Sequence, residues 1–137
     1  MSKQLKSTTN IQVRFADIDA MGHVNNAVYL SYFELARMDF FSKLIGTDWN
    51  WTDHGILLAR NEINYKQPIL LNDSIEIETW CSAIGNSSLT VEYVVYKIAG
   101  NDRIATTTGL SVLVCFDYSK QRKIEVPEIW KSNLLDA

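Results

Sequence analysis

The chain has 137 residues, 47% of them hydrophobic, which predicts a single domain spanning residues 1–137 with a sizeable core. Its net charge of −3 argues against a nucleic-acid-binding protein, because such proteins are usually basic. The same mild acidity means that an anionic substrate would need a local group of cations rather than a field from the whole protein.

The features of secreted and membrane proteins are missing from the sequence. Residues 1–10 are polar, unlike a signal peptide, and no run of eighteen apolar residues predicts a transmembrane helix. The two cysteines, Cys81 and Cys115, lie in apolar stretches and form no Cys-x-x-Cys pair, which favours buried, reduced thiols. We therefore expect a cytoplasmic protein without membrane insertion.

The N-terminal part of the chain predicts one strand followed by a loop. Residues 1–9 are interpreted as a frayed polar start. Residues 11–15 alternate apolar and polar side chains, a pattern typical of a strand. Residues 16–26 contain Asp, Gly, His and Asn, which favour a loop.

Residues 28–45 predict a long helix. The segment contains no Pro or Gly, and Gly46 follows it as a stop signal. Asn25 and Asn26 are candidate N-cap residues. Apolar side chains occur on most sides of this helix, so we expect it to be wrapped by other elements.

The second half of the chain predicts long strands joined by short turns, which indicates antiparallel hairpins. The expected strands are residues 56–65, 74–84, 89–98 and 104–116, and residues 118–137 are expected to form a short tail on the surface. One helix and one antiparallel sheet are best combined if the sheet curls around the helix. Such a sheet leaves exposed edges, which favours pairing with a second copy.

The loop before the helix carries the candidate chemistry. It brings two carboxylates, an imidazole and two amides to a helix start, where unpaired N–H groups and the positive end of the dipole suit developing negative charge. A carboxylate there can attack a thioester carbonyl, or take a proton from water that does so. An oxyanion donor and a positioned carboxylate are sufficient parts for hydrolysing an activated thioester.

Three other interpretations of this loop compete. Asp17-x-Asp19-x-x-Gly22 resembles the opening of a calcium loop, but Met21 and Val28 stand where later ligands belong. The Asp and Asn side chains could simply cap the helix and tie the loop. His23 could be a base or a metal ligand, but the only other histidine has no helical i,i+4 partner, so a zinc site is unsupported. We expect no metal and no cofactor.

The sequence resembles the 4-hydroxybenzoyl-CoA thioesterase-like family of hotdog proteins, in particular its bacterial fatty-acyl-CoA thioesterase branch. Three patterns carry the resemblance: Phe15-x-Asp17-x-Asp19-x-x-Gly22-His23-Val24-Asn25-Asn26-x-x-Tyr29, continued by Tyr32-Phe33-Glu34-x-Ala36-Arg37; Ile63-Asn64-Tyr65-x-x-Pro68; and Val114-Cys115-Phe116-Asp117. The first is long and specific, and the other two are supportive. The 4-hydroxybenzoyl enzyme itself lacks the His-Val-Asn-Asn run, which argues against specificity for its substrate.

The resemblance implies an α+β hotdog fold, in which a five-stranded antiparallel sheet wraps one long helix. It also implies homodimers with active sites at the subunit interface, often paired into homotetramers. By the same resemblance, Asp19 is the catalytic carboxylate and the backbone N–H of Asn26 is the oxyanion donor. His23 and Asn25 complete the catalytic set.

Four further residues are candidates for substrate binding. Tyr29 either lines the acyl pocket or belongs to the core. Lys66, Arg122 and Lys123 are candidates for the phosphates of CoA, because those groups need cations. A basic run such as residues 120–123 is, however, more often a solvated turn.

The leading hypothesis is an acyl-CoA thioesterase that releases free acid and CoA. The alternative is a non-catalytic module on the same fold that binds acyl-CoA or acyl chains. A hydratase is a third option, but the resembling hydratases use a different Asp/His arrangement on a longer segment that this sequence lacks.

Overall fold

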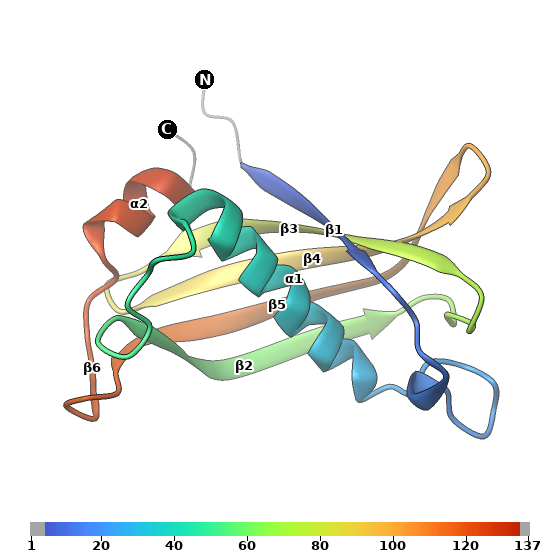
Figure 1. Cartoon of the computed structure of the whole chain (residues 1–137), viewed down its shortest axis with the longest axis horizontal. Helices are drawn as coiled ribbons and strands as arrows, with labels where there is room; N and C mark the ends of the chain where they lie inside the picture. The colour runs from blue at the N-terminus through green and yellow to red at the C-terminus, as the bar shows by residue number, and fades with distance from the viewer. Residues whose placement is uncertain (1–4, 135–137) are drawn as a thin grey trace.

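The structure is a computed structural model that describes residues 5–134. Its core is an antiparallel sheet in the order β1-β3-β4-β5-β2, with the helix α1 lying across one face (Figure 1). The elements are β1 (Lys6–Ile11), the 3-10 turn η1 (Phe15–Asp17), α1 (Val28–Ile45), β2 (Gly55–Tyr65), β3 (Ser74–Ile84), β4 (Ser88–Ala99), β5 (Asp102–Asp117), β6 (Arg122–Lys123) and α2 (Glu128–Leu134). The two-residue β6 pairs only with β5. The predicted fold class, five strands around one long helix, is confirmed.

The predicted bounds of the long helix are confirmed. Gly46 follows its last residue with φ of +106°, a conformation that glycine adopts without steric cost. On the side facing the sheet, Phe33, Ala36 and Phe40 are fully buried. The Phe33 ring stacks on Tyr93 of β4 with 4.2 Å between ring centroids and an angle of 5° between planes. The helix therefore packs directly on the middle of the sheet.

The prediction for the first strand was wrong. The strand spans Lys6–Ile11, so it begins within residues 1–9, which were expected to fray, and shares only Ile11 with the expected strand; the chain forms a 3-10 turn at residues 15–17. Residues 1–4 of the expected frayed start lie outside the described residues. The polar side chain of Ser7 is buried in β1, so the inward-facing pattern contains a hydroxyl that a search for apolar alternation does not detect. Backbone pairing with β3, from Lys6 opposite Trp80 to Ile11 opposite Ile75, holds the segment in place.

The four later strands follow the prediction and differ by two residues or fewer at each end. Burial alternates along most of β3 and β4, where inward residues such as Val91 and Val95 are buried while their neighbours are partly exposed; the edge strand β2 shows no such alternation. The expected buried cysteines are confirmed, since both Cys81 and Cys115 are fully buried thiols.

The C-terminal segment is more than the expected surface tail. Its helix α2 buries Trp130 and Leu134 completely. The Trp130 ring lies 5.4 Å from the Phe41 ring of α1 and within 6 Å of the rings of Trp49 and Trp51. Because α2 lies beside the C-terminal end of α1 (Figure 1), this aromatic cluster closes that end of the core.

Two further features of the fold concern its edge strand and its helices. First, β2 is an edge strand, because it pairs only with β5 within the described chain. Second, none of the helices in residues 5–134 has the length and hydropathy needed to cross a bilayer.

Candidate functional site

The two carboxylates of the loop have different roles in the structure. Asp17 is buried and accepts hydrogen bonds from the Arg14 backbone N–H at 2.9 Å, the Arg14 guanidinium at 2.8 and 3.1 Å, and the Tyr32 hydroxyl at 2.7 Å. Burial by itself raises the pKa of Asp17, but the hydrogen bonds from Arg14 and Tyr32 outweigh it and hold that pKa below its usual value. Asp17 is thus an ionised anchor that ties η1 to α1.

Asp19, in contrast, keeps part of its carboxylate available. Its Oδ1 accepts the Met21 N–H at 2.9 Å and the His23 N–H at 3.4 Å, and its own N–H donates to the His23 carbonyl at 2.9 Å. Gly22 completes the turn with φ of +81°. Within residues 5–134 the second oxygen, Oδ2, has no hydrogen-bond or ion-pair partner. The turn therefore holds Asp19 through one oxygen, while the other has no partner among the described residues.

The helix start is organised by Asn25, although not as an N-cap. The N-cap residue is Ala27, so the prediction that Asn25 or Asn26 caps the helix was wrong. The Asn25 Oδ1 accepts the Ala27 N–H at 2.9 Å, and the Asn25 carbonyl accepts the Val28 N–H at 2.9 Å. The N–H of Asn26 has no hydrogen-bond partner in the described part of the chain. The Asn26 N–H is thus unpaired beside the positive end of α1, within the described residues.

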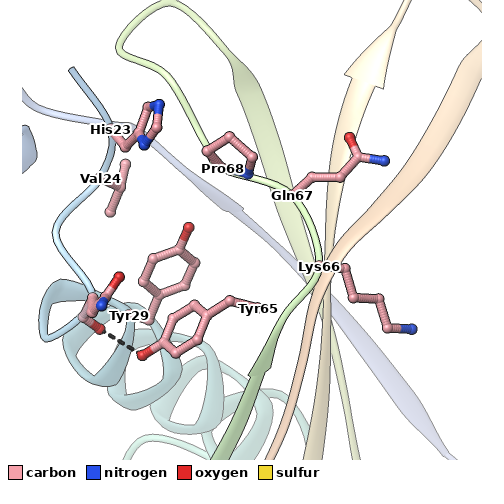
Figure 2. Close-up of a pocket in the computed structure, with 8 residues that line it drawn as sticks. His23, Val24, Tyr29, Tyr65, Lys66, Gln67 and Pro68 are labelled. Carbon is pink, nitrogen blue, oxygen red and sulfur yellow. Dashed lines mark hydrogen bonds between the residues drawn. The ribbon is translucent and has the colours of Figure 1, made fainter. Parts of the chain in front are cut away.

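A pocket of about 250 Å³ opens beside this amide. It is lined by the loop residues His23 and Val24, by Asn26 and Tyr29 at the helix start, and by residues 65–68 at the end of β2 (Figure 2). Four of the predicted site residues therefore meet at one cavity: His23, Asn26, Tyr29 and Lys66. Asp19 and Asn25 are not among its lining residues, and they adjoin it through their contacts with His23 and with the helix start.

Tyr29 belongs both to the core and to the pocket wall. Only 2% of its surface is exposed, and burial raises the pKa of its hydroxyl. Its ring meets the Tyr65 ring edge-on, with 5.0 Å between centroids. The two tyrosines stand between α1 and the end of β2, whereas the Lys66 side chain points away from them (Figure 2).

The other two predicted cations lie far from this pocket in the same chain. Arg122 and Lys123 are exposed residues of β6, where Lys123 pairs with Phe116 of β5. Phe116 also pairs with Gly55 at the start of β2, while the pocket lies at the other end, beside Tyr65. The span of β2 between these ends covers about 33 Å. One chain therefore does not bring Arg122 or Lys123 to its own pocket.

Tyr65 is a pocket residue to which the sequence assigned no role. The Tyr65 hydroxyl donates to the Asn26 carbonyl at 2.9 Å, the dashed contact in Figure 2. The signal for it was present in the Tyr65-x-x-Pro68 pattern. As for the metal interpretations, the structure of residues 5–134 contains no group of three His, Cys, Asp or Glu side chains placed to hold an ion.

Comparison with known proteins identifies relatives across most of the chain. The family described as "Thioesterase-like superfamily" matches residues 13–134. A thioesterase from Thermus thermophilus, crystallised with coenzyme A and Zn, is 37% identical, with a TM-score of 0.79 over 93% of this chain and 95% of that one. The long-chain acyl-CoA thioesterase FadM of Escherichia coli is 29% identical over 119 residues, 85% of this chain and 87% of that protein.

A third relative bears on the fold alone. A mutant 4-hydroxybenzoyl-CoA thioesterase in complex with 4-hydroxybenzoyl CoA superposes with a TM-score of 0.83 over 92% of this chain and 96% of that one, at 18% identity. The architecture is therefore shared at a level of identity that leaves the substrate open. The resemblance predicted from the loop and strand patterns is confirmed for both family and fold.

Proposed function

Because this chain belongs to the thioesterase-like superfamily and is a thioester hydrolase, we propose that it hydrolyses acyl-CoA, with Asp19 as the catalytic carboxylate. One observation carries the proposal. At the start of α1, beside a pocket, the loop leaves one carboxylate oxygen of Asp19 and the N–H of Asn26 without internal partners, within residues 5–134. A nucleophile or base and an oxyanion donor are the two parts that this reaction needs.

In the proposed reaction, the thioester carbonyl oxygen points at the Asn26 N–H. Asp19 takes a proton from a water whose oxygen attacks the carbonyl carbon, and the negative charge that forms on the carbonyl oxygen is held by the amide and the helix dipole. Collapse of this intermediate expels the CoA thiolate, which takes up a proton to give the thiol. His23 lines the pocket and supplies a hydrogen-bonding imidazole to the thioester or the water.

Direct attack by Asp19 is the second route to the same products. The carboxylate would then displace the CoA thiolate to form an anhydride, which water hydrolyses. A single turnover in ¹⁸O-water tests for the direct route. Label in the Asp19 carboxylate indicates attack by the side chain, followed by attack of water on the Asp19 carbonyl of the anhydride. Label in the product acid alone is expected from the water route and equally from attack of water on the acyl carbon of the anhydride.

The substrate proposal also requires a second copy of the chain. The free edge of β2 carries exposed Leu57 and Leu58, each 46% exposed, and an edge strand is suited to antiparallel pairing with its own copy. Antiparallel pairing reverses the direction of the partner, so the β6 end of one subunit would lie beside the Tyr65 end of the other. We propose that Arg122 and Lys123 bind the CoA phosphates of the partner's substrate, together with Lys66 at the mouth of the pocket.

The catalytic proposal is tested with a panel of acyl-CoA substrates and a thiol-reactive dye. Asp19→Asn keeps an oxygen for the Met21 N–H, so the loop remains closed, and we expect kcat to fall by about 10²- to 10⁴-fold. The matched control is Asp73→Asn, because the Asp73 carboxylate also closes a turn, by accepting the Leu70 N–H at 2.8 Å. Full activity of Asp19→Asn would contradict the assigned role. Binding of acyl-CoA without turnover by the wild type would favour the binding-module alternative.

The dimer proposal is tested by complementation. Asp19→Asn protein is mixed with an Arg122→Ala/Lys123→Ala protein under conditions that exchange subunits. If β6 serves the partner's pocket, each mixed dimer has one intact site, and low-KM activity returns. If each β6 serves its own pocket, no intact site forms and the mixture stays impaired. Light scattering of the purified protein provides the oligomeric state.

A further inference from the structure

Tyr65 makes a contact that links the sheet to the catalytic loop. It is the last residue of β2 and pairs with Thr107 of β5. Its hydroxyl donates to the carbonyl of Asn26, a residue 39 positions earlier, at 2.9 Å (Figure 2). The hydroxyl is therefore fixed by the sheet and acts on the residue that supplies the unpaired amide.

Three hydrogen bonds hold the two peptide units on either side of the Asn26 Cα. The Asn26 carbonyl and the Ala27 N–H belong to one planar peptide unit. Tyr65 binds the carbonyl of this unit, and the Asn25 Oδ1 binds its N–H. In the preceding unit, the Asn25 carbonyl accepts the Val28 N–H. Among the described residues, only the Asn26 N–H of these two units lacks a partner, so its direction is set by three hydrogen bonds.

We propose that Tyr65 is a positioning residue, which holds the Asn26 amide toward the oxygen that becomes charged in the transition state. The inference rests on the proposed function. An oxyanion donor is effective when it is oriented before the reaction, because no free energy is then spent on turning it. Removing the hydroxyl leaves the Asn26–Ala27 peptide held only through its N–H. Asn26 can then turn about its Cα, and the adjoining peptide that carries the Asn26 N–H can tilt away from the substrate around its one remaining hydrogen bond, from the Val28 N–H.

The surroundings of Tyr65 make this hydroxyl separable from the rest of the fold. The ring is held edge-on by Tyr29 at 5.0 Å. The next two backbone N–H groups, of Lys66 and Gln67, both donate to the Thr106 carbonyl, at 2.9 and 3.1 Å. Burial raises the pKa of Tyr65, so the hydroxyl remains a donor throughout the pH range of an activity assay. Tyr65→Phe should therefore remove one hydrogen bond and leave the ring and the strand end in place.

The kinetic test uses Tyr65→Phe beside wild type and Tyr118→Phe. Tyr118 is the matched control, since its hydroxyl also donates to a backbone carbonyl, that of Ile56 at 2.6 Å. We expect Tyr65→Phe to lower kcat by about 10- to 100-fold, with KM within about threefold of wild type. Tyr118→Phe should keep the wild-type kcat. Melting temperatures of all three proteins should agree within about 2 °C, because an exposed neutral hydrogen bond contributes little to stability.

A binding measurement separates positioning from structural damage. A trifluoromethyl ketone analogue of the acyl-CoA forms an oxyanion in the site, whereas a CoA thioether mimics only the ground state. Tyr65→Phe should lower the affinity for the ketone by the same factor by which it lowers kcat. The affinity for the thioether should stay unchanged.

Three results would overturn the inference. A kcat within twofold of wild type in Tyr65→Phe would show that the hydroxyl does not position the amide. A rise in KM with unchanged kcat would make Tyr65 a substrate-binding residue instead. If the wild type hydrolyses no acyl-CoA at all, the proposed function fails and this inference fails with it. The first two results, in contrast, are obtained with an active wild type, so they refute the role of Tyr65 and leave the proposed function standing.

Discussion

The close approach of α1 to the sheet depends on Gly109 of β5. A Cβ at this position would lie 2.5 and 2.8 Å from two atoms of the Phe33 ring and 2.8 Å from the Glu62 carbonyl oxygen. Phe33 is fully buried and stacked on Tyr93, and Glu62 is held in the β2–β5 ladder. Neither the Phe33 ring nor the Glu62 backbone can move away freely, so the added methyl group of Gly109→Ala should strain the core.

We expect Gly109→Ala to destabilise the protein by about 3 kcal/mol, the upper part of the usual range for overpacking. For 137 residues, the entropy of unfolding is about 0.3 kcal/mol per degree, so the melting temperature should fall by about 10 °C. Urea unfolding followed by tryptophan fluorescence, together with a thermal melt, measures both quantities.

The matched control for this prediction is Gly85→Ala. The nearest atom to a Cβ at Gly85 is the flexible Ser88 hydroxyl oxygen at 3.3 Å. The free energy of unfolding of Gly85→Ala should therefore stay within about 1 kcal/mol of the wild-type value. In a Gly109→Ala/Phe33→Leu double variant, the ring contact is lost but the contact with Glu62 remains, so part of the lost stability should return. If Gly109→Ala melts within about 1 °C of wild type, the close packing of helix on sheet is refuted.

Two further predictions concern ionisable groups. The folded-state pKa of Asp17 is lowered, so its contribution to stability is complete above the unfolded pKa of about 3.9 and is lost as the pH falls through the folded value. Asp17→Asn should therefore lower the free energy of unfolding by about 2 kcal/mol at pH 7. In urea titrations below about pH 4, the difference in unfolding free energy between this variant and wild type should become smaller. Burial raises the pKa of Cys81 and of Cys115 to about 11, so neither thiol should react with a disulfide dye at pH 8 until urea unfolds the chain and two thiols per chain appear. Rapid labelling of the native protein would contradict the burial of these thiols.

The sequence by itself determined the elements whose signals are local. The helix at residues 28–45 was predicted to the residue, because its apolar content, its lack of Pro and Gly and the stop at Gly46 all lie within one stretch of sequence. The later strands were found because short turns separate runs of β-branched and aromatic residues. The loop that we propose to be catalytic was predicted from a pattern that also lies within one stretch of the chain.

Tertiary structure decided what depends on partners distant in sequence. Asp17 and Asp19 are two residues apart and look alike in the sequence. In the structure, the Tyr32 hydroxyl and the Arg14 guanidinium donate hydrogen bonds to Asp17 only, and one oxygen of Asp19 has no partner among the described residues. Likewise, no local pattern says that Tyr65 meets the Asn26 carbonyl.

The two errors at the ends of the chain have the same cause. The segment containing Ser7 and the segment containing Trp130 are both too polar on average to predict burial. In the N-terminal segment, pairing with β3 buries Ser7. In the C-terminal segment, Trp130 is buried because it packs against rings from α1 and from the loop before β2. Burial of a side chain is a property of the surfaces that meet it, and those surfaces come together only when the whole chain folds.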